Sequence, residues 1–160
     1  MQEYVMYTDG SCPRNGEPDA AGGWAFVGIR EPELPLDKQT TWVEASGRCN
    51  PDPDTPNTSI RMELLAAIKA LQHIKPGSTV TLYSDSAYLV NGVTQRWYVK
   101  WFATGKNAAG KIPANLDLWR PLVGLLKERK VRMIHIKGHA GHRWQELCDT
   151  LAVAQSTKEE

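Results

Sequence analysis

The order of its predicted elements is the feature of this sequence that most restricts the fold. Three strand-like segments come first, one long helix follows, and helices alternate with two further strands after it. An order of this kind is typical of a single mixed sheet with helices packed on its faces. We therefore predict an α/β fold with one five-stranded mixed sheet that is flanked by helices.

Turn residues and hydrophobic periodicity set approximate bounds for these elements. The predicted strands are 4–8, 23–29, 40–46, 79–84 and 131–137, and the predicted helices are 59–74, 87–92, 94–103, 116–130 and 143–155. The clearest helix is 59–74, because Asn57, Thr58 and Ser59 offer N-cap oxygens and Pro76-Gly77 ends it. Gly92 is expected to separate the two short helices.

The size and composition of the chain indicate one globular domain. Its 160 residues, 41% of them hydrophobic, suffice for one core, so we predict a domain over 1–156 and a short polar tail over 157–160. No apolar run approaches the ~20 residues of a membrane span, and the N-terminus lacks a signal-peptide pattern, so we expect a cytoplasmic protein without membrane contact. Three widely spaced cysteines form no CxxC pair and are expected to be reduced thiols: Cys12, Cys49 and Cys148.

The net charge of +1 conceals an uneven distribution of charged residues. No acidic residue lies between Asp85 and Asp117, and from Arg120 to Arg143 there are seven Lys or Arg residues against the single Glu128. A basic second half of this kind favours binding to a polyanion such as a nucleic acid. The alternative is that these cations only form solvated faces.

Two predicted strands end in nearly the same residues, Tyr7-Thr8-Asp9-Gly10-Ser11 and Tyr83-Ser84-Asp85-Ser86. Each motif places an aspartate at the carboxyl end of an apolar or β-branched strand, where α/β sheets tend to form ligand sites. A single aspartate after a strand is more often a turn former or a helix cap. Asp9 and Asp85 are therefore candidates that need support from other residues.

Glu63 stands out because of the side of the predicted helix on which it lies. At about 100° per residue it falls in the arc of Ala67, Ala70 and Ile74, roughly opposite Arg61. A buried glutamate is costly unless it is paired, hydrogen-bonded or bound to a metal. We therefore favour a ligand role for Glu63 over a role as partner of the helix dipole.

Asp149 borders the apolar stripe of the last predicted helix and, taken alone, fits an exposed surface residue. Carboxylates that converge repel one another and need a cation, and all-oxygen ligand sets favour Mg²⁺ or Mn²⁺ over zinc. Two such ions, ~3.5–4 Å apart, can activate a water and stabilise the leaving oxygen in phosphodiester cleavage.

Five motifs, in order along the chain, resemble those of the type 1 ribonuclease H family. They are Asp9-Gly10-Ser11-Cys12, Arg61-Met62-Glu63-Leu64, Ser84-Asp85-Ser86, Lys137-Gly138-His139-Ala140-Gly141-His142 and Cys148-Asp149. The resemblance extends from the first strand to the last helix. It implies a ribonuclease H-like fold, in which the first three strands are antiparallel. It also implies an endonuclease that hydrolyses the RNA strand of RNA–DNA hybrids by a two-metal-ion mechanism, leaving 5′-phosphate and 3′-hydroxyl ends.

The resemblance also implies a role for each catalytic position. Asp9 would bridge two Mg²⁺ ions, for which Mn²⁺ could substitute. Asp149 would complete the site of the nucleophilic water, and Glu63 with Asp85 would hold the site beside the leaving 3′ oxygen. His139 matches a histidine that is thought to help proton transfer or product release, and the glycines beside it permit loop motion.

Further positions match the family's nucleic-acid contacts. Trp97 and Trp101 are four residues apart, so they share a helix face in a segment that resembles the basic protrusion that grips the DNA strand. The alternative is that these aromatic side chains enter the core. Thr58 and Asn115 resemble the pair that cradles a DNA phosphate. The other implied contacts are Gly10, Ser11 and Asn15.

The chain departs from the family at positions that contact the substrate rather than the metal. Ser59-Ile60 stands where many relatives have two asparagines, Ala87 where many have glutamine, and Gln145 where many have asparagine. Pro56 stands where a basic phosphate contact often lies. Selectivity for the hybrid is therefore less constrained by the sequence than the nuclease chemistry is.

Two other classes of protein remain as alternatives. One is another nuclease of the same fold, such as a transposase or integrase core or the ribonuclease H domain of a reverse transcriptase. The other is a non-catalytic hybrid-binding protein, which would be expected if a carboxylate were missing, and none is. We favour a stand-alone, monomeric ribonuclease H without a hybrid-binding module before the first strand and without an obligate protein partner.

Overall fold

The computed structural model describes residues 3–30, 42–137 and 142–158. The strands are β1 (Glu3–Ser11), β2 (Gly22–Arg30), β3 (Val43–Cys49), β4 (Thr79–Ser84) and β5 (Lys130–His135). The helices are α1 (Ser59–Gln72), α2 (Ala87–Thr94), α3 (Trp97–Thr104), α4 (Leu116–Lys127) and α5 (Arg143–Ser156). In the described part of the chain, none of them is long and apolar enough to cross a bilayer.

One mixed sheet contains the five strands in the order β3-β2-β1-β4-β5. β2 pairs antiparallel with both β1 and β3, while β4 lies parallel to β1 and β5 lies parallel to β4. The predicted five-stranded α/β sheet with three antiparallel first strands is therefore confirmed. Because β1 is the central strand, the residues at its carboxyl end lie between β2 and β4.

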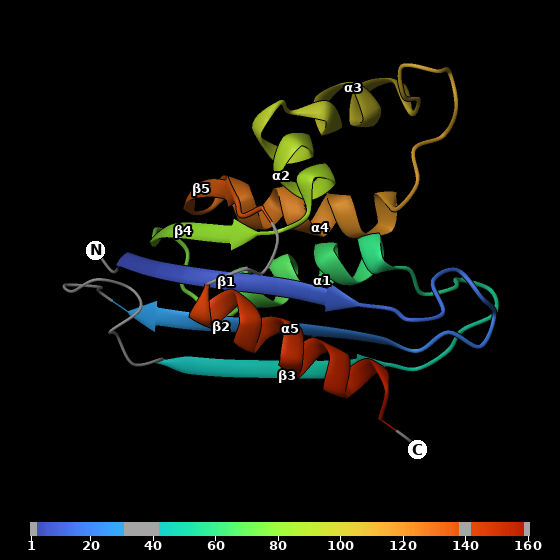
Figure 1. The fold of residues 1–160 in the computed structure, drawn as a ribbon. Helices are drawn as coiled ribbons and strands as arrows, with labels where there is room; N and C mark the ends of the chain where they lie inside the picture. The colour runs from blue at the N-terminus through green and yellow to red at the C-terminus, as the bar shows by residue number, and fades with distance from the viewer. Residues whose placement is uncertain (1–2, 31–41, 138–141, 159–160) are drawn as a thin grey trace.

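Helices cover both faces of this sheet (Figure 1). α1 packs against β1 and β2 on one face and also contacts α4, whereas α5 crosses the other face and contacts β1, β2 and β3. Two hydrophobic clusters are buried between these layers, the larger around Met6, Leu64 and Trp119 and the smaller around Val27 and Trp144. α3 projects away from the sheet, beyond α2 (Figure 1).

α1 forms where the sequence predicts the clearest helix. The hydroxyl of Thr58 caps it by accepting a hydrogen bond from the backbone N–H of Arg61 at 3.1 Å. Its buried side includes Leu64, Leu71 and also Glu63, in agreement with the helix phase. The packing of α1 on the sheet therefore carries a carboxylate into the interior.

The strands differ from the prediction at their ends. β1 continues past residue 8, because the segment 9–11 stays paired with 23–25 of β2. Asp9 is thus a residue within a strand, whereas Asp85 directly follows β4. β3 ends at Cys49 rather than at residue 46, because its last residues pair with 22–24 of β2. The predicted start of this strand, residue 40, lies outside the described residues.

Two helix predictions were wrong for reasons of packing. Gly92 does not separate two helices: it lies inside α2, where a Cβ would be 2.5 Å from the ring of Trp119. The break comes at Arg96, whose φ of 57° is left-handed. α4 stops short of residue 130, because the Lys130 N–H donates to the Ser78 carbonyl at 2.9 Å and Lys130 becomes the first residue of β5.

Candidate active site

Three of the predicted carboxylates converge at one edge of the sheet. Thr8 of β1 lies beside Ser84 of β4 in the parallel register, so Asp9 and Asp85 follow at neighbouring positions. Glu63 reaches the same place from α1. Ligand oxygens of these three carboxylates, one from each, all lie within 4.8 Å of one another.

Gly10 lets α1 come close enough to β1 to bring Glu63 beside Asp9. A Cβ at this position would lie 2.5 Å from the backbone nitrogen of Glu63 and 2.5 Å from the backbone carbonyl carbon of Met62. A larger residue would therefore push the helix away from the strand. Gly10, which was predicted to contact nucleic acid, has a packing role that the sequence did not indicate.

Burial and mutual repulsion disfavour the charged forms of these carboxylates. Asp9 is 2% exposed and Glu63 is 8% exposed, whereas Asp85 is half-buried. Burial and then the charge of Asp85 raise the pKa of Asp9 to about 7, although the Gly10 N–H, 2.9 Å from Asp9 Oδ1, acts against this shift. Burial and then the charge of Asp9 raise the pKa of Glu63 well above its ordinary value. The group therefore favours the approach of positive charge.

Two oxygens of this group, Asp9 Oδ2 and Glu63 Oε2, are buried without a hydrogen-bond partner among the described residues. A buried acceptor without a donor is costly, and a bound cation would remove that cost. Carboxylate oxygens are the ligands that Mg²⁺ and Mn²⁺ prefer. The residues present therefore fit a hard divalent cation.

The fourth predicted carboxylate, Asp149, lies near this group but outside it. It is half-buried on α5, and its charge adds to the larger effects of burial and of Asp85 on the pKa of Asp9. It does not contribute to the set of ligand atoms within 4.8 Å of one another. His139, the predicted loop histidine, lies outside the described residues.

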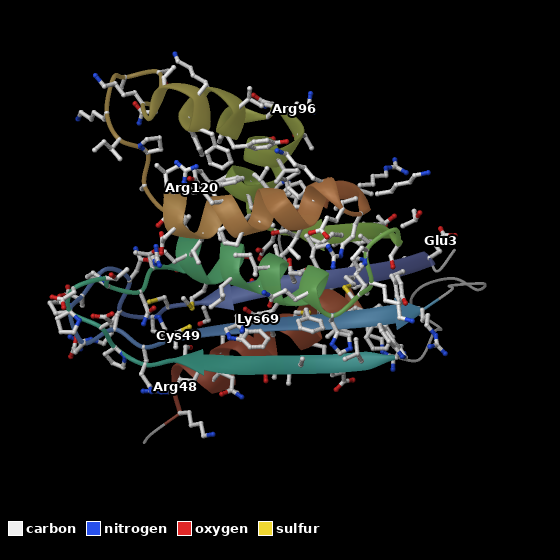
Figure 2. The ribbon with its side chains drawn as sticks, turned by 180° about the vertical axis from the view of Figure 1, so that it is seen from behind. Glu3, Arg48, Cys49, Lys69, Arg96 and Arg120 are labelled. Atoms are coloured by element: carbon white, nitrogen blue, oxygen red, sulfur yellow. The ribbon has the colours of Figure 1, made fainter. Side chains whose placement is uncertain are left out.

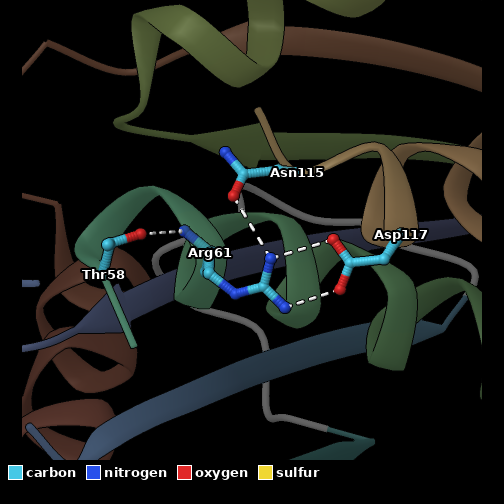
Figure 3. A network of polar contacts seen from close by, with 4 residues as sticks. All are labelled: Thr58, Arg61, Asn115 and Asp117. Atoms are coloured by element: carbon cyan, nitrogen blue, oxygen red, sulfur yellow. Dashed lines mark hydrogen bonds and ion pairs between the residues drawn. The ribbon is translucent and has the colours of Figure 1, made fainter. Parts of the chain in front are cut away.

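Thr58 and Asn115, the predicted pair at a DNA phosphate, are joined through Arg61 (Figure 3). Thr58 accepts the backbone N–H of Arg61, and Asn115 Oδ1 accepts a hydrogen bond from Arg61 Nη1 at 3.2 Å. The guanidinium also donates two hydrogen bonds to Asp117, at 2.9 and 2.7 Å. Because Thr58 and Asn115 are the N-cap residues of α1 and α4, this network holds the two helix N-termini together.

Arg61 was not among the predicted site residues. Its position inside the motif Arg61-Met62-Glu63-Leu64 was the signal that could have identified it, since a motif arginine on the polar side of α1 is available for contacts. Its hydrogen bonds to Asp117 lower the pKa of that carboxyl, so the ion pair persists at neutral pH.

Two other residues that were predicted to contact nucleic acid form hydrogen bonds within the protein. Asn15 Oδ1 accepts the backbone N–H of Ser59 at 2.6 Å, which ties the loop after β1 to the start of α1. The hydroxyl oxygens of Ser11 and Ser156 are 2.9 Å apart, which ties the end of β1 to the end of α5. Asn15 is exposed and Ser11 is half-buried, so Asn15 is the more accessible of the two.

Trp97 and Trp101 lie one turn apart on α3, with ring centroids 6.2 Å apart. Trp101 packs edge-to-face on the buried Trp119, at 5.4 Å between centroids, so α3 is anchored to the core. Both rings also line a pocket of about 560 Å³ together with Arg96 and Lys100. Figure 2 shows Arg96 at the end of the projecting helix α3, where that helix begins. The two tryptophans thus combine core packing with an open basic surface.

Gln145 lies in the core rather than on the surface, where a residue that recognises the substrate strand would be. Its side chain is fully buried, and its Nε2 donates to the Thr8 carbonyl at 2.9 Å. Of the other departures from the family pattern, Ser59, Ile60 and Ala87 are exposed and Pro56 is half-buried. A substrate can therefore reach the side chains of Ser59, Ile60 and Ala87, whereas it cannot reach that of Gln145.

Known proteins share both the sequence pattern and the fold of this chain. The family model described as RNase H matches residues 1–157. A ribonuclease H of Syntrophomonas wolfei subsp. wolfei is 41% identical over 155 residues, which are 95% of this chain and 94% of that protein.

Solved structures show the same similarity. LC9-RNase H1, a type 1 RNase H with the type 2 active-site motif, is 28% identical with a TM-score of 0.77, over 96% of this chain and 72% of that one. A foamy viral protease-reverse transcriptase, solved in complex with an RNA/DNA hybrid, has a TM-score of 0.76 at 19% identity, over 96% of this chain and 20% of that one. The second similarity concerns the fold alone.

Proposed function

This chain belongs to the ribonuclease H family, and from that premise we propose that it hydrolyses the RNA strand of RNA–DNA hybrids by a two-metal-ion mechanism. It is an endoribonuclease. In this proposal its products carry 5′-phosphate and 3′-hydroxyl ends. The cofactor is Mg²⁺, with two ions in the site, and Mn²⁺ can substitute for it.

The observation that carries the proposal is the buried group formed by Asp9, Glu63 and Asp85. Three like charges with ligand atoms within 4.8 Å of one another need a cation to remain ionised together. Two of their oxygens have no other partner in the described part of the chain. Such a group, with cations bound, suits phosphodiester hydrolysis, in which an activated water attacks the phosphorus and negative charge develops on the leaving oxygen.

We assign a position to each carboxylate. Asp9, the most buried of them, would hold both ions; the Gly10 N–H donates to its Oδ1, and its Oδ2 has no hydrogen-bond partner among the described residues. Asp149 would help to hold the metal ion beside the nucleophilic water. Glu63 and Asp85 would help to hold the metal ion beside the leaving 3′ oxygen. When bound, the ions supply an activated water and stabilise the leaving oxygen. His139 keeps its proposed role in proton transfer or product release.

We further propose that a DNA phosphate binds beside Thr58 and Asn115. Arg61 keeps these two residues together, and the N-terminal N–H groups and dipoles of α1 and α4 favour an anion there. Trp97 and Trp101 suit contact with the DNA strand, because they line a pocket together with the cations Arg96 and Lys100. The remaining proposed contacts are Gly10, Ser11 and Asn15.

The domain organisation, compartment and assembly are part of the same proposal. We propose one catalytic domain over 1–156, followed by a polar tail over 157–160, since α5 ends at Ser156. The three free cysteines, Cys12, Cys49 and Cys148, fit the reducing cytoplasm. We propose that the enzyme acts as a monomer.

The test is cleavage of a labelled strand in RNA–DNA, RNA–RNA and DNA–DNA duplexes, with Mg²⁺, with Mn²⁺ and with EDTA. We expect cleavage of the RNA in the hybrid only, and only with a divalent ion. Equal cleavage of DNA duplexes would refute the substrate assignment and would favour a transposase-like or integrase-like activity. A polymerase should extend the product's 3′ end, and phosphatase treatment should remove its 5′-phosphate.

The matched variant is Asp9→Asn, which keeps the shape of the side chain and removes its charge. It should lose cleavage while binding the hybrid, because Asp9 is assigned to both ions. An Asp9→Asn protein with full activity would refute the metal-site assignment.

A further inference from the structure

We propose that Gln145 is a positioning residue for Asp149, acting through the hydrogen bond that holds α5 on β1. The inference rests on the proposed function, in which Asp149 helps to hold a metal ion. It gives Gln145 a role in assembling the metal site instead of a role in contacting the substrate strand.

Gln145 connects two positions that adjoin the proposed metal ligands. Its Nε2 donates to the carbonyl of Thr8 at 2.9 Å, and Thr8 immediately precedes Asp9 on β1. It also lies four residues before Asp149, so the two share one side of α5, one turn apart. One hydrogen bond therefore joins the strand that carries Asp9 to the helical turn that carries Asp149.

Packing alone does not account for an amide at this position. Gln145 and Thr8 are both fully buried, and Gln145 Oε1 has no partner among the described residues. Leucine or methionine would fill a similar volume without the cost of burying a polar group. The amide therefore contributes its hydrogen bond to Thr8 at the cost of one unsatisfied oxygen.

Two further side-chain hydrogen bonds of α5 differ from this connection, one in strength and one in place. Cys148 Sγ donates to the Tyr7 carbonyl at 3.2 Å, but a thiol is a weak donor. Gln155 Nε2 donates to Ser46 Oγ at 3.1 Å, and that bond fixes the far half of α5 on β3. The amide of Gln145 is thus a stronger donor to β1 than the thiol of Cys148.

The position of α5 matters because Asp149 stands outside the group of Asp9, Glu63 and Asp85. Its distance from Asp9 depends on how the helix docks on the sheet, which the bond at Thr8 sets. Loss of that bond would leave the first half of α5 free to shift and would carry Asp149 with it. Mutation of a residue that orients a metal ligand typically lowers the affinity for the metal by about 10–100-fold.

The experiment compares Gln145→Leu and Gln145→Met with the control Gln155→Leu. The control removes an amide from the same helix, but one that binds β3. Binding of Mn²⁺ to the substrate-free protein is followed by the electron paramagnetic resonance signal of the free ion. The Mg²⁺ concentration at half-maximal cleavage and the KM for the hybrid are measured in parallel, together with thermal unfolding.

We expect both Gln145 variants to raise the Mn²⁺ dissociation constant and the Mg²⁺ midpoint by about tenfold, with an unchanged KM for the hybrid. Gln155→Leu should keep the wild-type values of all three. A role in strand recognition would instead raise the KM and leave Mn²⁺ binding unchanged, and that result would overturn the proposal. An equal loss of Mn²⁺ affinity in Gln155→Leu would also overturn it.

A purely structural role predicts lower thermal stability of the Gln145 variants with wild-type Mn²⁺ affinity, which would count against positioning. If the branched Leu does not fit, the flexible Met provides the same measurement. Failure of both variants to fold would mean that the amide serves the core as a whole, against the proposal. A wild-type protein that cleaves the hybrid without any divalent ion would refute the proposed function itself, which keeps the two failures distinct.

Discussion

Asp9, Glu63 and Asp85 are ordinary carboxylates whose surroundings change their chemistry. Burial, more than any specific partner, raises the pKa of Asp9 and of Glu63, and the neighbouring charges add to that shift. The residue that makes this arrangement possible is Gly10, since only the absence of a side chain lets α1 bring Glu63 to the strand. At the scale of residues, a glycine is thus as necessary to the site as its acids.

We expect Gly10→Ala to lose most of its cleavage activity. The added methyl would lie 2.5 Å from the backbone nitrogen of Glu63, so α1 must move and carry Glu63 away from Asp9. A misplacement of ~1 Å can cost about 100-fold in rate, and overpacking costs about 1–3 kcal/mol of unfolding free energy. Hybrid cleavage and thermal unfolding measure these effects. Gly124→Ala on α4, where a Cβ meets nothing within 4 Å, should remain fully active, and an equally active Gly10→Ala would contradict this account.

At the scale of elements, helix ends and one projecting helix form the surface beside the site. The N-termini of α1 and α4 meet through the Arg61 network, and α3 stands out from the sheet beyond α2 (Figures 1 and 3). α3 keeps this position because Trp101 packs on Trp119. Because α3 is held in this way, its exposed cations can contact a long substrate at a fixed distance from the site.

We expect Lys100→Ala to weaken hybrid binding and to reduce its dependence on salt. Lys100 is exposed beside the pocket of α3, and each lysine–phosphate contact contributes about 0.9 to the slope of log affinity against log salt. The slope should therefore fall by about 1, as measured by fluorescence anisotropy at several KCl concentrations. Lys127→Ala, which removes an exposed cation from the opposite end of α4 to Asn115, should keep the wild-type slope. An unchanged slope in Lys100→Ala would remove α3 from the proposed interface.

At the scale of the whole molecule, the carboxylate group lies where the ends of β1 and β4 meet α1, and α5 covers the opposite face of the sheet. In the metal-free protein the folded state binds more protons than the unfolded state, because the pKa of Asp9 is raised from 3.8 to about 7. The free energy of unfolding therefore falls as the pH rises from about 4 to about 7. A divalent cation would take the place of these protons and restore the lost stability.

We expect Mg²⁺ to raise the melting temperature more at pH 8 than at pH 5, where Asp9 and Glu63 keep their protons. Calorimetry with Mg²⁺ and with EDTA at both pH values measures the difference. In EDTA at pH 8, Asp9→Asn should be more stable than the wild type by roughly 1–3 kcal/mol, because it removes one of the repelling charges. An equal effect of Mg²⁺ at both pH values would show that the ion binds elsewhere.

The order of the elements and three of the site residues could be predicted from local patterns. Cap and turn residues bound α1, helix phase turned Glu63 inward, and two similar strand ends linked Asp9 to Asp85. The errors lie where distant segments meet. β1 continues through Ser11 because β2 pairs with it, and Gly92 stays inside α2 because Trp119 packs on it.

The sequence by itself determined the order of the elements along the chain and the acidic residues that the family resemblance implies, since both follow from short-range patterns and motifs. Only the tertiary structure decided that Asp149 stands apart from the other three carboxylates and that Gln145 is buried. Both depend on how α5 docks across the sheet, and the bond that fixes this docking joins residues 137 positions apart. A contact over such a separation leaves no periodic signal in the chain, because it is set by the packing of complete elements.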